Sequence, residues 1–494
     1  MPKYSYSDYR TKMQKIADLR YAAALLQWDQ ETYLPKKGQA ARGRQFATLE
    51  EAAHEAFTDP ELGDLLKELT HQPDLTDVEK RNIALTQEAY DRHRKIPSTL
   101  VRQLSEAIQQ AFHAWSEAYP ASDFKRFEQP LDQLIQLKRQ EADLLGYSGH
   151  PYNALMNDYE KGLTTDEVDA LFNDLIPQLQ PIIQAASERS ASPIFQGHFP
   201  HDAQWKLGME MLAHIGFDFE AGRQDLSLHP FTINFGARDV RLTTRIDEAD
   251  FGNMLWSCLH EGGHGLYEQG LPDAEYGLPS GEYCSLSIHE SQSRLWENNI
   301  GRGKPFWSFA FPLVQEAFPD AFKAVSLDTF YSAMNQVRPS LIRTEADELT
   351  YHAHIRIRYE LEKALLAGSL STKEIPEAWA AGYQSNLGVQ VPNDKMGCLQ
   401  DVHWSHGSFG YFATYSLGSL YAAQFYAAMQ NQVPELEAQL ARGNCQPVLA
   451  WLRTHIHAVG KTRSAREICE HATGEALHAR YFVQYAQKKF LSEL

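Results

Sequence analysis

Cysteines are few in this sequence, and long apolar runs are lacking. The 494 residues contain five cysteines and no CxxC pair, which argues against a disulfide framework and against a cysteine-based zinc site. We expect reduced thiols in a cytoplasmic protein, with Cys258 and Cys284 buried as small apolar residues. No run of about 20 apolar residues is present, so no membrane-spanning helix is predicted.

Basic runs and nucleotide-binding motifs are lacking as well. The formal net charge is −18, and without Lys/Arg-rich segments the chain is not expected to bind nucleic acid. No GxxxxGK[ST], GxGxxG or GxSxG element occurs, which leaves phosphate-loop, dinucleotide-binding and serine-hydrolase chemistry without support. The first residues lead directly into an amphipathic pattern, so we expect neither a signal peptide nor attachment to a membrane.

Helical periodicity dominates the chain, and no low-complexity linker or internal repeat marks a domain boundary. Start signals of the capping-box type occur at Thr164–Glu167 and Ser371–Glu374. Two apolar stripes with helical spacing are expected to face a core: Leu104, Ile108, Phe112 and Trp115, and Val168, Leu171, Leu175 and Leu179.

One segment, residues 231–245, departs from the helical pattern. It is rich in β-branched and aromatic residues, alternates in part, and has Gly236 and Asp239 in its middle, which is typical of a β-hairpin. An exposed edge strand can hold an extended peptide by main-chain hydrogen bonds. A small sheet just before the motif described next is therefore of interest.

The pentapeptide His260–His264, HEGGH, is the strongest chemical signal. On a helix, residues at i and i+4 share a face, so two imidazoles could bind one zinc ion, with Glu261 beside the water that the metal activates. Two other interpretations stay open. The chain has 20 histidines, so the pattern can arise by chance. Gly262, Gly263 and Gly265 each disfavour a helix by about 1 kcal/mol, which would suit a loop.

A third metal ligand is needed, and Glu290 is the first candidate. It lies 26 residues after His264 (290 − 264), in a segment that resembles a helix ended by Gly301 and Gly303. An ion pair with Arg294 is the simpler alternative. Three other glutamates are rivals, one on the same helix as His264 and two on an expected loop: Glu268, Glu275 and Glu282.

Three more segments are weak signals individually. Residues 400–406 gather two histidines around Asp401, and residues 407–412 form a glycine-rich aromatic turn that carries Tyr411. Arg343 is followed by Asp347 four residues later, and an ion pair between the two is the simplest role for this arginine.

Taken together, these segments resemble the carboxypeptidase Taq family of metallocarboxypeptidases. Six motifs that mark the family occur here in order: HPF at 229–231, DxRxT at 239–243, HExxH at 260–264, HES/GQ at 289–292, IRxxAD at 342–347 and GxxQDxHW at 397–404. Trp28 and Asp29 near the start and residues 472–474 near the end are also similar to the family. The resemblance therefore spans nearly the whole chain.

The resemblance implies a mostly α-helical fold, one large domain over residues 1–494 with a small β-sheet beside a deep groove, similar to neurolysin-like peptidases. It implies a homodimer that removes single C-terminal amino acids from peptides with a free C-terminus. It implies zinc as the cofactor, with cobalt able to replace it, and Glu290 as the third ligand. It also makes His403 and Tyr411 candidates for transition-state stabilisation, with Tyr415 and Tyr421 close by in sequence.

The expected mechanism follows from these assignments. His260, His264 and Glu290 bind zinc, and Glu261 takes a proton from the attacking water and later protonates the leaving amine. A free α-carboxylate is best recognised by a guanidinium. Arg343 is the candidate for this role and Arg241 the reserve, although Arg241 and Asp239 are expected rather to shape the sheet.

Three competing functions stay open. The same scaffold could carry an endo-oligopeptidase or a dipeptidyl carboxypeptidase. It could be a non-catalytic peptide-binding protein with a vestigial metal site, although an intact Glu261 argues against that. A structural zinc site would need four protein ligands, often cysteines, and none lies at ligand spacing.

Overall fold

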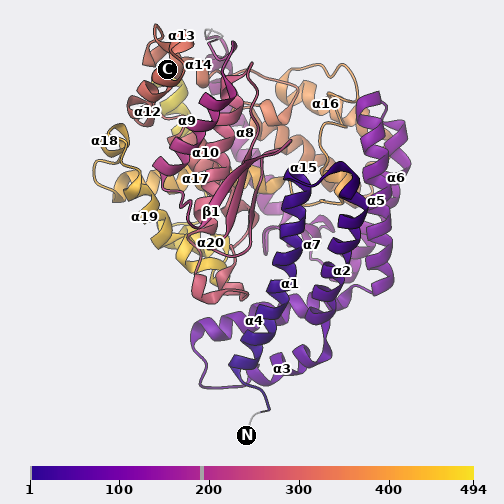
Figure 1. Ribbon diagram of the computed structural model, residues 1–494. Coiled ribbons are helices and arrows are strands. Elements are labelled where there is room, and N and C mark those ends of the chain that lie inside the picture. The colour runs from indigo at the N-terminus through magenta and orange to yellow at the C-terminus, as the bar shows by residue number, and fades with distance from the viewer. Residues whose placement is uncertain (1–2, 190–193, 494) are drawn as a thin grey trace. The chain divides into compact units, whose positions relative to one another are not determined.

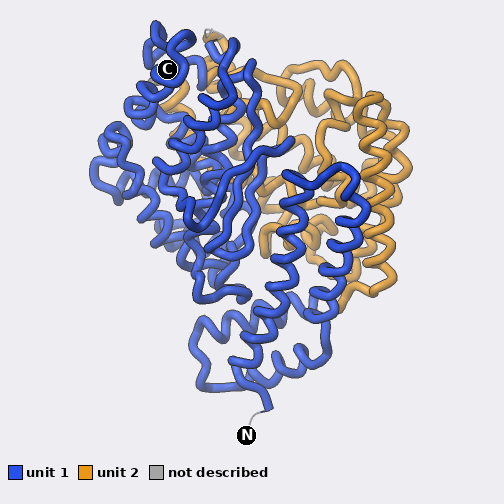
Figure 2. Tube along the Cα trace, in the orientation of Figure 1, with its two compact units in different colours: residues 1–93, 192–334, 421–477 blue, residues 94–191, 335–420, 478–494 orange. Residues whose placement is uncertain are grey.

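The computed structural model describes residues 3–189 and 194–493 (Figure 1). Met1 and Pro2, which begin the expected domain, lie outside the described residues, as do 190–193 and 494. The chain forms two compact units, each made of three segments (Figure 2). Unit 1 contains residues 1–93, 192–334 and 421–477, and unit 2 contains residues 94–191, 335–420 and 478–494. The expectation of one domain stays a prediction.

Unit 1 is helical around a small sheet. Its helices are α1 (Tyr6–Thr32), α2 (Gln39–Thr58), α3 (Pro60–Thr70), α4 (Asp77–Lys95), α9 (His201–Ile215), α10 (Phe251–Glu268), α11 (Leu286–Arg294), α12 (Lys304–Ala317), α13 (Pro319–Phe322), α14 (Leu327–Met334), α17 (Ala413–Gln432), α18 (Leu436–Ala441), α19 (Gln446–His455) and α20 (Ala465–Thr473). Helix α4 runs on into unit 2, and α17 begins there. A π-helical turn, η4 (Leu295–Ile300), continues α11.

All the regular elements among the described residues of unit 2 are helices. Its helices are α5 (Ser98–Ala121), α6 (Lys125–Leu145), α7 (Tyr152–Met156), α8 (Thr165–Ser187), α15 (Tyr351–Ala367), α16 (Ile375–Leu387) and α21 (Arg480–Gln487). The short turns η5 (Arg343–Glu345) and η7 (His403–His406) carry two of the candidate site residues. The prediction of a mostly α-helical protein with a small sheet is confirmed.

The sheet has three strands in the order β1-β3-β2. Strands β2 (Thr232–Asn234) and β3 (Val240–Thr244) pair antiparallel, with Thr232 opposite Leu242, so the predicted hairpin is confirmed. Strand β1 (Gly222–Leu226), which was not predicted from the sequence, pairs parallel with β3. Helix α10 contacts β3, α9 and α11 (Figure 1), so the sheet lies directly against the helix that carries the HEGGH motif.

The helix start signals are confirmed, and one core prediction is wrong. Capping boxes form at Thr164 with Glu167 and at Ser371 with Glu374. On α8, Val168, Leu175 and Leu179 are buried as expected, whereas Leu171 is only partly buried. On α5, Phe112 is 42% exposed. Its ring lies against those of Trp115 and His406 instead of entering the core.

All five cysteines are free and buried, as the composition suggested. Across the described residues, no helix is both long and apolar enough to span a membrane.

Candidate metal centre

The HEGGH motif lies in the middle of helix α10, so the loop interpretation is wrong. The Asp250 side chain caps the helix by accepting a hydrogen bond from the Gly252 amide at 2.8 Å. Phe251 fixes the first turn because its ring packs against those of Phe199 and Phe322, with centroids 5.5 and 4.9 Å away. Because α10 continues to Glu268, His260 and His264 project from one helical face.

Close packing against α11 explains why the motif contains a helix-disfavouring glycine at position 263. A Cβ at this position would lie 2.5 Å from the Gln292 carbonyl oxygen and 2.6 Å from the Ser293 Cα, both on α11. A side chain here would therefore push the α11 backbone away. The glycine allows the two helices to approach closely, and this approach brings Glu290 to the histidines.

Three side chains converge at this crossing, and we call them the metal-ligating group: His260, His264 and Glu290. One ligand atom from each lies within 4.8 Å of the others. Glu290 Oε2 is 3.8 Å from His260 Nε2 and 3.6 Å from His264 Nε2. Tetrahedral zinc with bonds of about 2.1 Å needs ligand atoms about 3.4 Å apart. The donor set therefore fits a single divalent metal ion.

The remaining polar atom of each ligand is already hydrogen-bonded. His260 Nδ1 lies 2.8 Å from a carboxylate oxygen of Glu297, and Arg294 donates to Glu290 Oε1 at 2.7 Å. His264 Nδ1 lies 2.5 Å from His289 Nδ1, and His289 Nε2 lies 2.7 Å from Glu268. Carboxylates only accept, so protons belong on His260 Nδ1 and His289 Nε2, and His264 donates to His289. Both ligand histidines thus keep an Nε2 lone pair for the metal.

The rival glutamates are engaged elsewhere. Glu268 accepts from His289. Glu275 accepts from Arg10 and Ser280, and Glu282 pairs with Lys461 at 3.4 Å. The pair between Glu290 and Arg294 exists as well, but it occupies only Oε1 and leaves Oε2 facing the histidines.

Burial and charge act differently on the two ligand histidines. Burial lowers the pKa of His264 well below its usual value, and the neighbouring His289 and His260 lower it further. Burial also disfavours the charged form of His260, but the carboxylates of Glu290 and Glu297 outweigh it and raise the pKa. Glu297 stays ionised because Arg294 and His260 overcome its burial and hold its pKa well below the usual range.

Glu261 lies next to this group and is 7% exposed. Burial raises the pKa of its carboxyl group, while His260 and a hydrogen bond from Thr232 oppose the shift. The Thr232 hydroxyl is 2.6 Å from Glu261 Oε2. A carboxyl whose pKa is raised is a stronger base, which suits a group that must accept a proton.

Arg343 does not pair with Asp347, so the simplest interpretation of its role is wrong. Its guanidinium donates to Asp401 Oδ1 at 2.9 Å from Nε and 2.8 Å from Nη2. Asp347 instead accepts hydrogen bonds from the amides of Arg338, Leu349 and Thr350. The partner could not be found from helical spacing because Asp401 is 58 residues away in the chain.

Asp401 binds a second arginine, and we call Arg343, Arg358 and Asp401 the arginine cluster. Arg358 Nε donates to Asp401 Oδ2 at 2.6 Å, and both guanidiniums are almost fully buried. Two cations share one anion, so the cluster carries one surplus positive charge. Burial together with the charge of Arg343 lowers the pKa of the neighbouring His403 to about 3, which leaves this imidazole neutral at pH 7.

His403 contacts Tyr415 more directly than Tyr411. Its Nε2 lies 3.2 Å from the Tyr415 hydroxyl, although the Tyr411 ring is the nearer one, with centroids 5.4 Å from that of His403 against 6.1 Å for Tyr415. The Tyr415 ring also lies 5.0 Å from the Arg343 guanidinium carbon. These residues belong to unit 2 and the metal-ligating group to unit 1, and their predicted roles stay predictions.

The Arg241 guanidinium contacts a carboxylate and an aromatic ring, both within unit 1. It forms two 2.9 Å hydrogen bonds to Asp239, and its guanidinium carbon lies 4.3 Å from the Trp28 ring centroid. It is the second residue of β3 and lies opposite Arg223 on β1. These contacts favour a role in shaping the sheet over a role in binding substrate.

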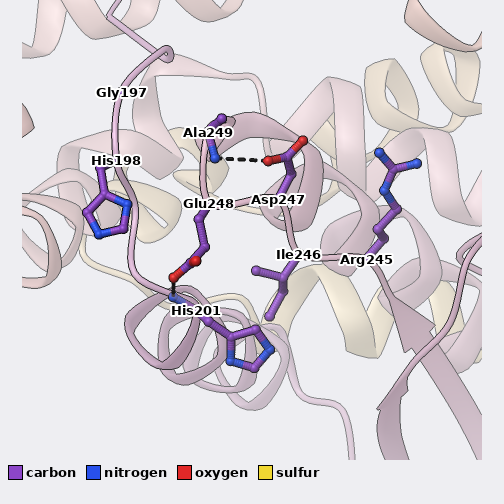
Figure 3. Close-up of a pocket in the computed structure, with 8 residues that line it drawn as sticks. All are labelled: Gly197, His198, His201, Arg245, Ile246, Asp247, Glu248 and Ala249. Carbon is purple, nitrogen blue, oxygen red and sulfur yellow. Dashed lines mark hydrogen bonds between the residues drawn. The ribbon is translucent and has the colours of Figure 1, made fainter.

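A cavity of about 540 Å³ lies elsewhere in unit 1, at the start of α9 (Figure 3). Its lining includes His198, His201, Arg245 and Glu248 but no member of the metal-ligating group. Glu248 accepts a hydrogen bond from the His201 amide at 2.9 Å, and so caps the helix (Figure 3). We therefore do not assign the chemistry to this cavity.

The residues that hold the ligands and the other candidate side chains in place were not predicted from the sequence. Glu297 follows Glu290 by seven residues, which is two helical turns. This spacing places both carboxylates on one face of a helix and could have indicated that Glu297 lies near the site. His289 was visible only as part of the HES/GQ motif. Thr232, Arg358 and Asp401 gave no local signal for their contacts, because each reaches its partner through tertiary structure.

The chain is similar to known proteins along nearly its whole length. The family model for the carboxypeptidase Taq (M32) metallopeptidases matches residues 8–490. The thermostable carboxypeptidase 1 of Thermus thermophilus is 41% identical over 504 residues, which cover 99% of each chain. The solved structure of the protein CHT superposes with a TM-score of 0.97 at 55% identity over 99% of each chain. The M32 carboxypeptidase of Deinococcus radiodurans gives 0.96 at 38% identity over 98% of each chain.

Proposed function

This chain belongs to the carboxypeptidase Taq (M32) family of metallopeptidases and is a metallocarboxypeptidase, and from this premise we propose that it binds one zinc ion and releases single C-terminal amino acids from peptides. The observation that carries the proposal is the convergence of His260 Nε2, His264 Nε2 and Glu290 Oε2. Two imidazoles and one carboxylate are a ligand set typical of catalytic zinc, which keeps a fourth position open. Cobalt is expected to replace zinc at the same atoms.

The chemistry that bound zinc supplies is the acidification of water and the polarisation of the scissile carbonyl. Glu261 accepts the proton of the attacking water on its carboxylate and later donates it to the leaving amine. Its raised pKa favours the first transfer, because it makes the carboxylate a stronger base. His403, neutral at pH 7, together with Tyr411 or Tyr415, is proposed to donate hydrogen bonds to the oxyanion.

The surplus charge of the arginine cluster supports recognition of a free C-terminus. A buried unpaired cation is costly unless an anion accompanies it. The α-carboxylate of a peptide would neutralise the cluster, and we propose that it binds Arg343 Nη1 in place of the Tyr351 hydroxyl, to which this atom donates at 3.3 Å. Arg343 is thus the proposed carboxylate-binding residue, with Arg241 as the reserve. A homodimer and a cytoplasmic location are further proposals.

Metal analysis tests the first half of the proposal. We expect about one zinc ion per chain in the wild type and almost none in His260→Ala, His264→Ala or Glu290→Ala. Glu275→Ala and Glu282→Ala are matched controls that should keep the metal. Full metal in Glu290→Ala would reassign the third ligand.

Mass spectrometry of a digested peptide tests the second half. A ladder that shortens by one residue from the C-terminus is expected, and the C-terminally amidated peptide should be a poor substrate. Release of dipeptides or internal fragments would instead favour a dipeptidyl carboxypeptidase or an endo-oligopeptidase. Absence of turnover with full zinc would favour a binding protein.

Arg343→Ala separates the role of the carboxylate from that of the metal. The variant should fold, because Asp401 keeps Arg358 as its partner and the cluster becomes neutral. We expect the fall in kcat/KM on free-acid peptides to correspond to a loss of roughly 2–5 kcal/mol in transition-state stabilisation, the effect of removing one member of a buried charge pair. Discrimination between acid and amide should shrink, and unchanged discrimination would remove Arg343 from this role.

A further inference from the structure

The Glu261 carboxylate is held by a residue outside the metal-ligating group. Thr232 Oγ1 lies 2.6 Å from Glu261 Oε2 and 3.2 Å from the Glu261 carbonyl oxygen. A hydroxyl has one proton to donate, and the shorter contact to the charged acceptor is the stronger. Among residues 3–189 and 194–493, Thr232 is the only side chain hydrogen-bonded to this carboxylate.

The hydroxyl comes from the edge of the sheet. Thr232 is the first residue of β2, which pairs with β3 on one side only. Glu261 lies on α10, which contacts both strands. The hydrogen bond therefore joins a single short strand to the side chain that the proposed function makes the general base.

We propose that Thr232 is a positioning residue for Glu261: by holding Oε2, it turns Oε1 towards the reacting water and makes Oε1 the oxygen that accepts the proton. The inference rests on the proposed function. A carboxylate free to rotate would present its basic lone pair in the required direction for only part of the time. Misplacement of a catalytic group by about 1 Å can cost about 10²-fold in rate.

The sheet offers a matched control for a purely structural role. Thr244, on β3, forms a hydroxyl contact of the same 2.6 Å length with Ser257, one turn before Glu261 on the same helix. Both threonines join the sheet to α10, and only Thr232 reaches the carboxylate. Valine replaces threonine with nearly the same shape and without the hydroxyl. The pair Thr232→Val and Thr244→Val therefore separates positioning of the base from attachment of the helix.

The test combines steady-state kinetics on a free-acid peptide with metal analysis. Thr232→Val should keep one zinc ion and an unchanged KM but lose about 10- to 100-fold in kcat, and Thr232→Ser should recover most of it. Thr244→Val should keep the wild-type kcat while its unfolding midpoint falls. In crystals of the metal-free protein, the Glu261 carboxylate should hold one orientation in the wild type and the Ser variant, and several in the Val variant.

Three results would overturn the inference: wild-type kcat in Thr232→Val, loss of zinc from that variant, or an equal loss of kcat in Thr244→Val. Its failure is distinct from failure of the proposed function. A wild-type protein without carboxypeptidase activity contradicts the proposed function, whereas an active wild type matched by Thr232→Val contradicts only the role of Thr232.

Discussion

The two histidines of the metal-ligating group are oriented by different partners. A carboxylate, Glu297, holds His260 directly, whereas a second histidine, His289, holds His264 and is itself held by Glu268. Both arrangements fix the ring and the tautomer, so each Nε2 is ready to bind a cation. Orientation of this kind limits the conformational entropy lost when the metal binds.

Glu297 gives the first prediction at the scale of single residues. Glu297→Ala removes the acceptor behind His260, and we expect zinc affinity to fall by about 10- to 100-fold, the usual effect of losing such a partner. Competition with a chelator measures the change. Glu316→Ala, an exposed glutamate on α12, is the control and should bind zinc like the wild type. Equal affinity in Glu297→Ala would mean that packing alone orients His260.

Glu261 gives the second prediction. Glu261→Gln keeps the shape and the Thr232 contact but cannot accept a proton. We expect zinc content to stay normal and kcat to fall by at least about 10³-fold, since general base catalysis contributes about 10²–10⁴. Near-normal turnover with normal zinc would exclude Glu261 from the mechanism.

At the scale of single residues, the sequence predicted the side chains whose arrangement depends on local helical spacing. His260, Glu261 and His264 follow from helical spacing, and Glu290 was favoured over three rivals by resemblance rather than by spacing. The partner of Arg343 was predicted wrongly because Asp347 is near in sequence and Asp401 is near in space. Hydrogen-bond partners depend on how elements cross, and local spacing does not contain that information.

At the scale of elements, the crossing of α10 and α11 is the central feature of unit 1. Gly263 lets the backbones approach, and Glu290 reaches the histidines because of it. The π-helical turn η4 follows α11 immediately and carries Glu297 back to His260. Such turns often occur at functional sites.

Gly263 gives the prediction at this scale. Gly263→Ala favours the isolated helix by about 1 kcal/mol but places a methyl group against the α11 backbone. We expect a net destabilisation of about 1–3 kcal/mol from overpacking and a weaker zinc site. Urea unfolding and metal analysis measure the two effects.

Gly43→Ala is the control for Gly263→Ala. Gly43 is an exposed residue of α2, and a Cβ there would meet nothing within 4 Å. This variant should gain up to about 1 kcal/mol of stability and keep full zinc. If Gly263→Ala gained stability as well, the close approach would not need glycine.

Helices and strands with a strong local sequence pattern were predicted correctly. Strand β1, which lacks such a pattern, was not predicted. The hairpin at 231–245 has β-branched residues in alternation, and α8 begins with a capping box. Strand β1 reads Gly-Arg-Gln-Asp-Leu and pairs in parallel with a strand 18 residues later (Gly222 with Val240). Its polar composition gives no strand signal, so pairing with β3 decides its conformation.

At the scale of the whole molecule, the two units are interleaved along the chain. Two of the changes from one unit to the other fall inside helices, at residues 93–94 in α4 and 420–421 in α17. A boundary inside a helix needs no linker rich in glycine or proline. At these two positions the sequence therefore shows no boundary, although each unit has its own core.

The core of unit 2 contains a carboxyl group without a cationic partner among the hydrogen bonds described. Glu362, on α15, accepts hydrogen bonds from Trp404 Nε1 at 2.8 Å, the Gly410 amide at 3.0 Å and the Tyr152 hydroxyl. These donors favour the ionised form, but burial outweighs them and raises the pKa of Glu362 from 4.5 to about 7. Ionisation of this group is therefore coupled to the stability of the fold.

The sign of the coupling gives the last prediction. Between pH 4.5 and 7 the folded state holds a proton on Glu362 that the unfolded state has released, so stability falls as pH rises through this window and is level above it. The loss should be on the order of 3 kcal/mol, from about 1.4 kcal/mol for each pH unit. Glu362→Gln cannot titrate and also leaves one N–H donor without an acceptor, so it should be less stable than the wild type at low pH.

The measurement is the difference in urea unfolding free energy between the wild type and Glu362→Gln, followed from pH 4.5 to 8. Groups that titrate in both proteins cancel, and the advantage of the wild type should shrink steadily up to pH 7 and then stay constant. A difference that does not change with pH would mean that Glu362 titrates alike in the folded and unfolded states. A difference that grows with pH would mean that the three hydrogen-bond donors outweigh burial and hold the carboxylate ionised inside unit 2.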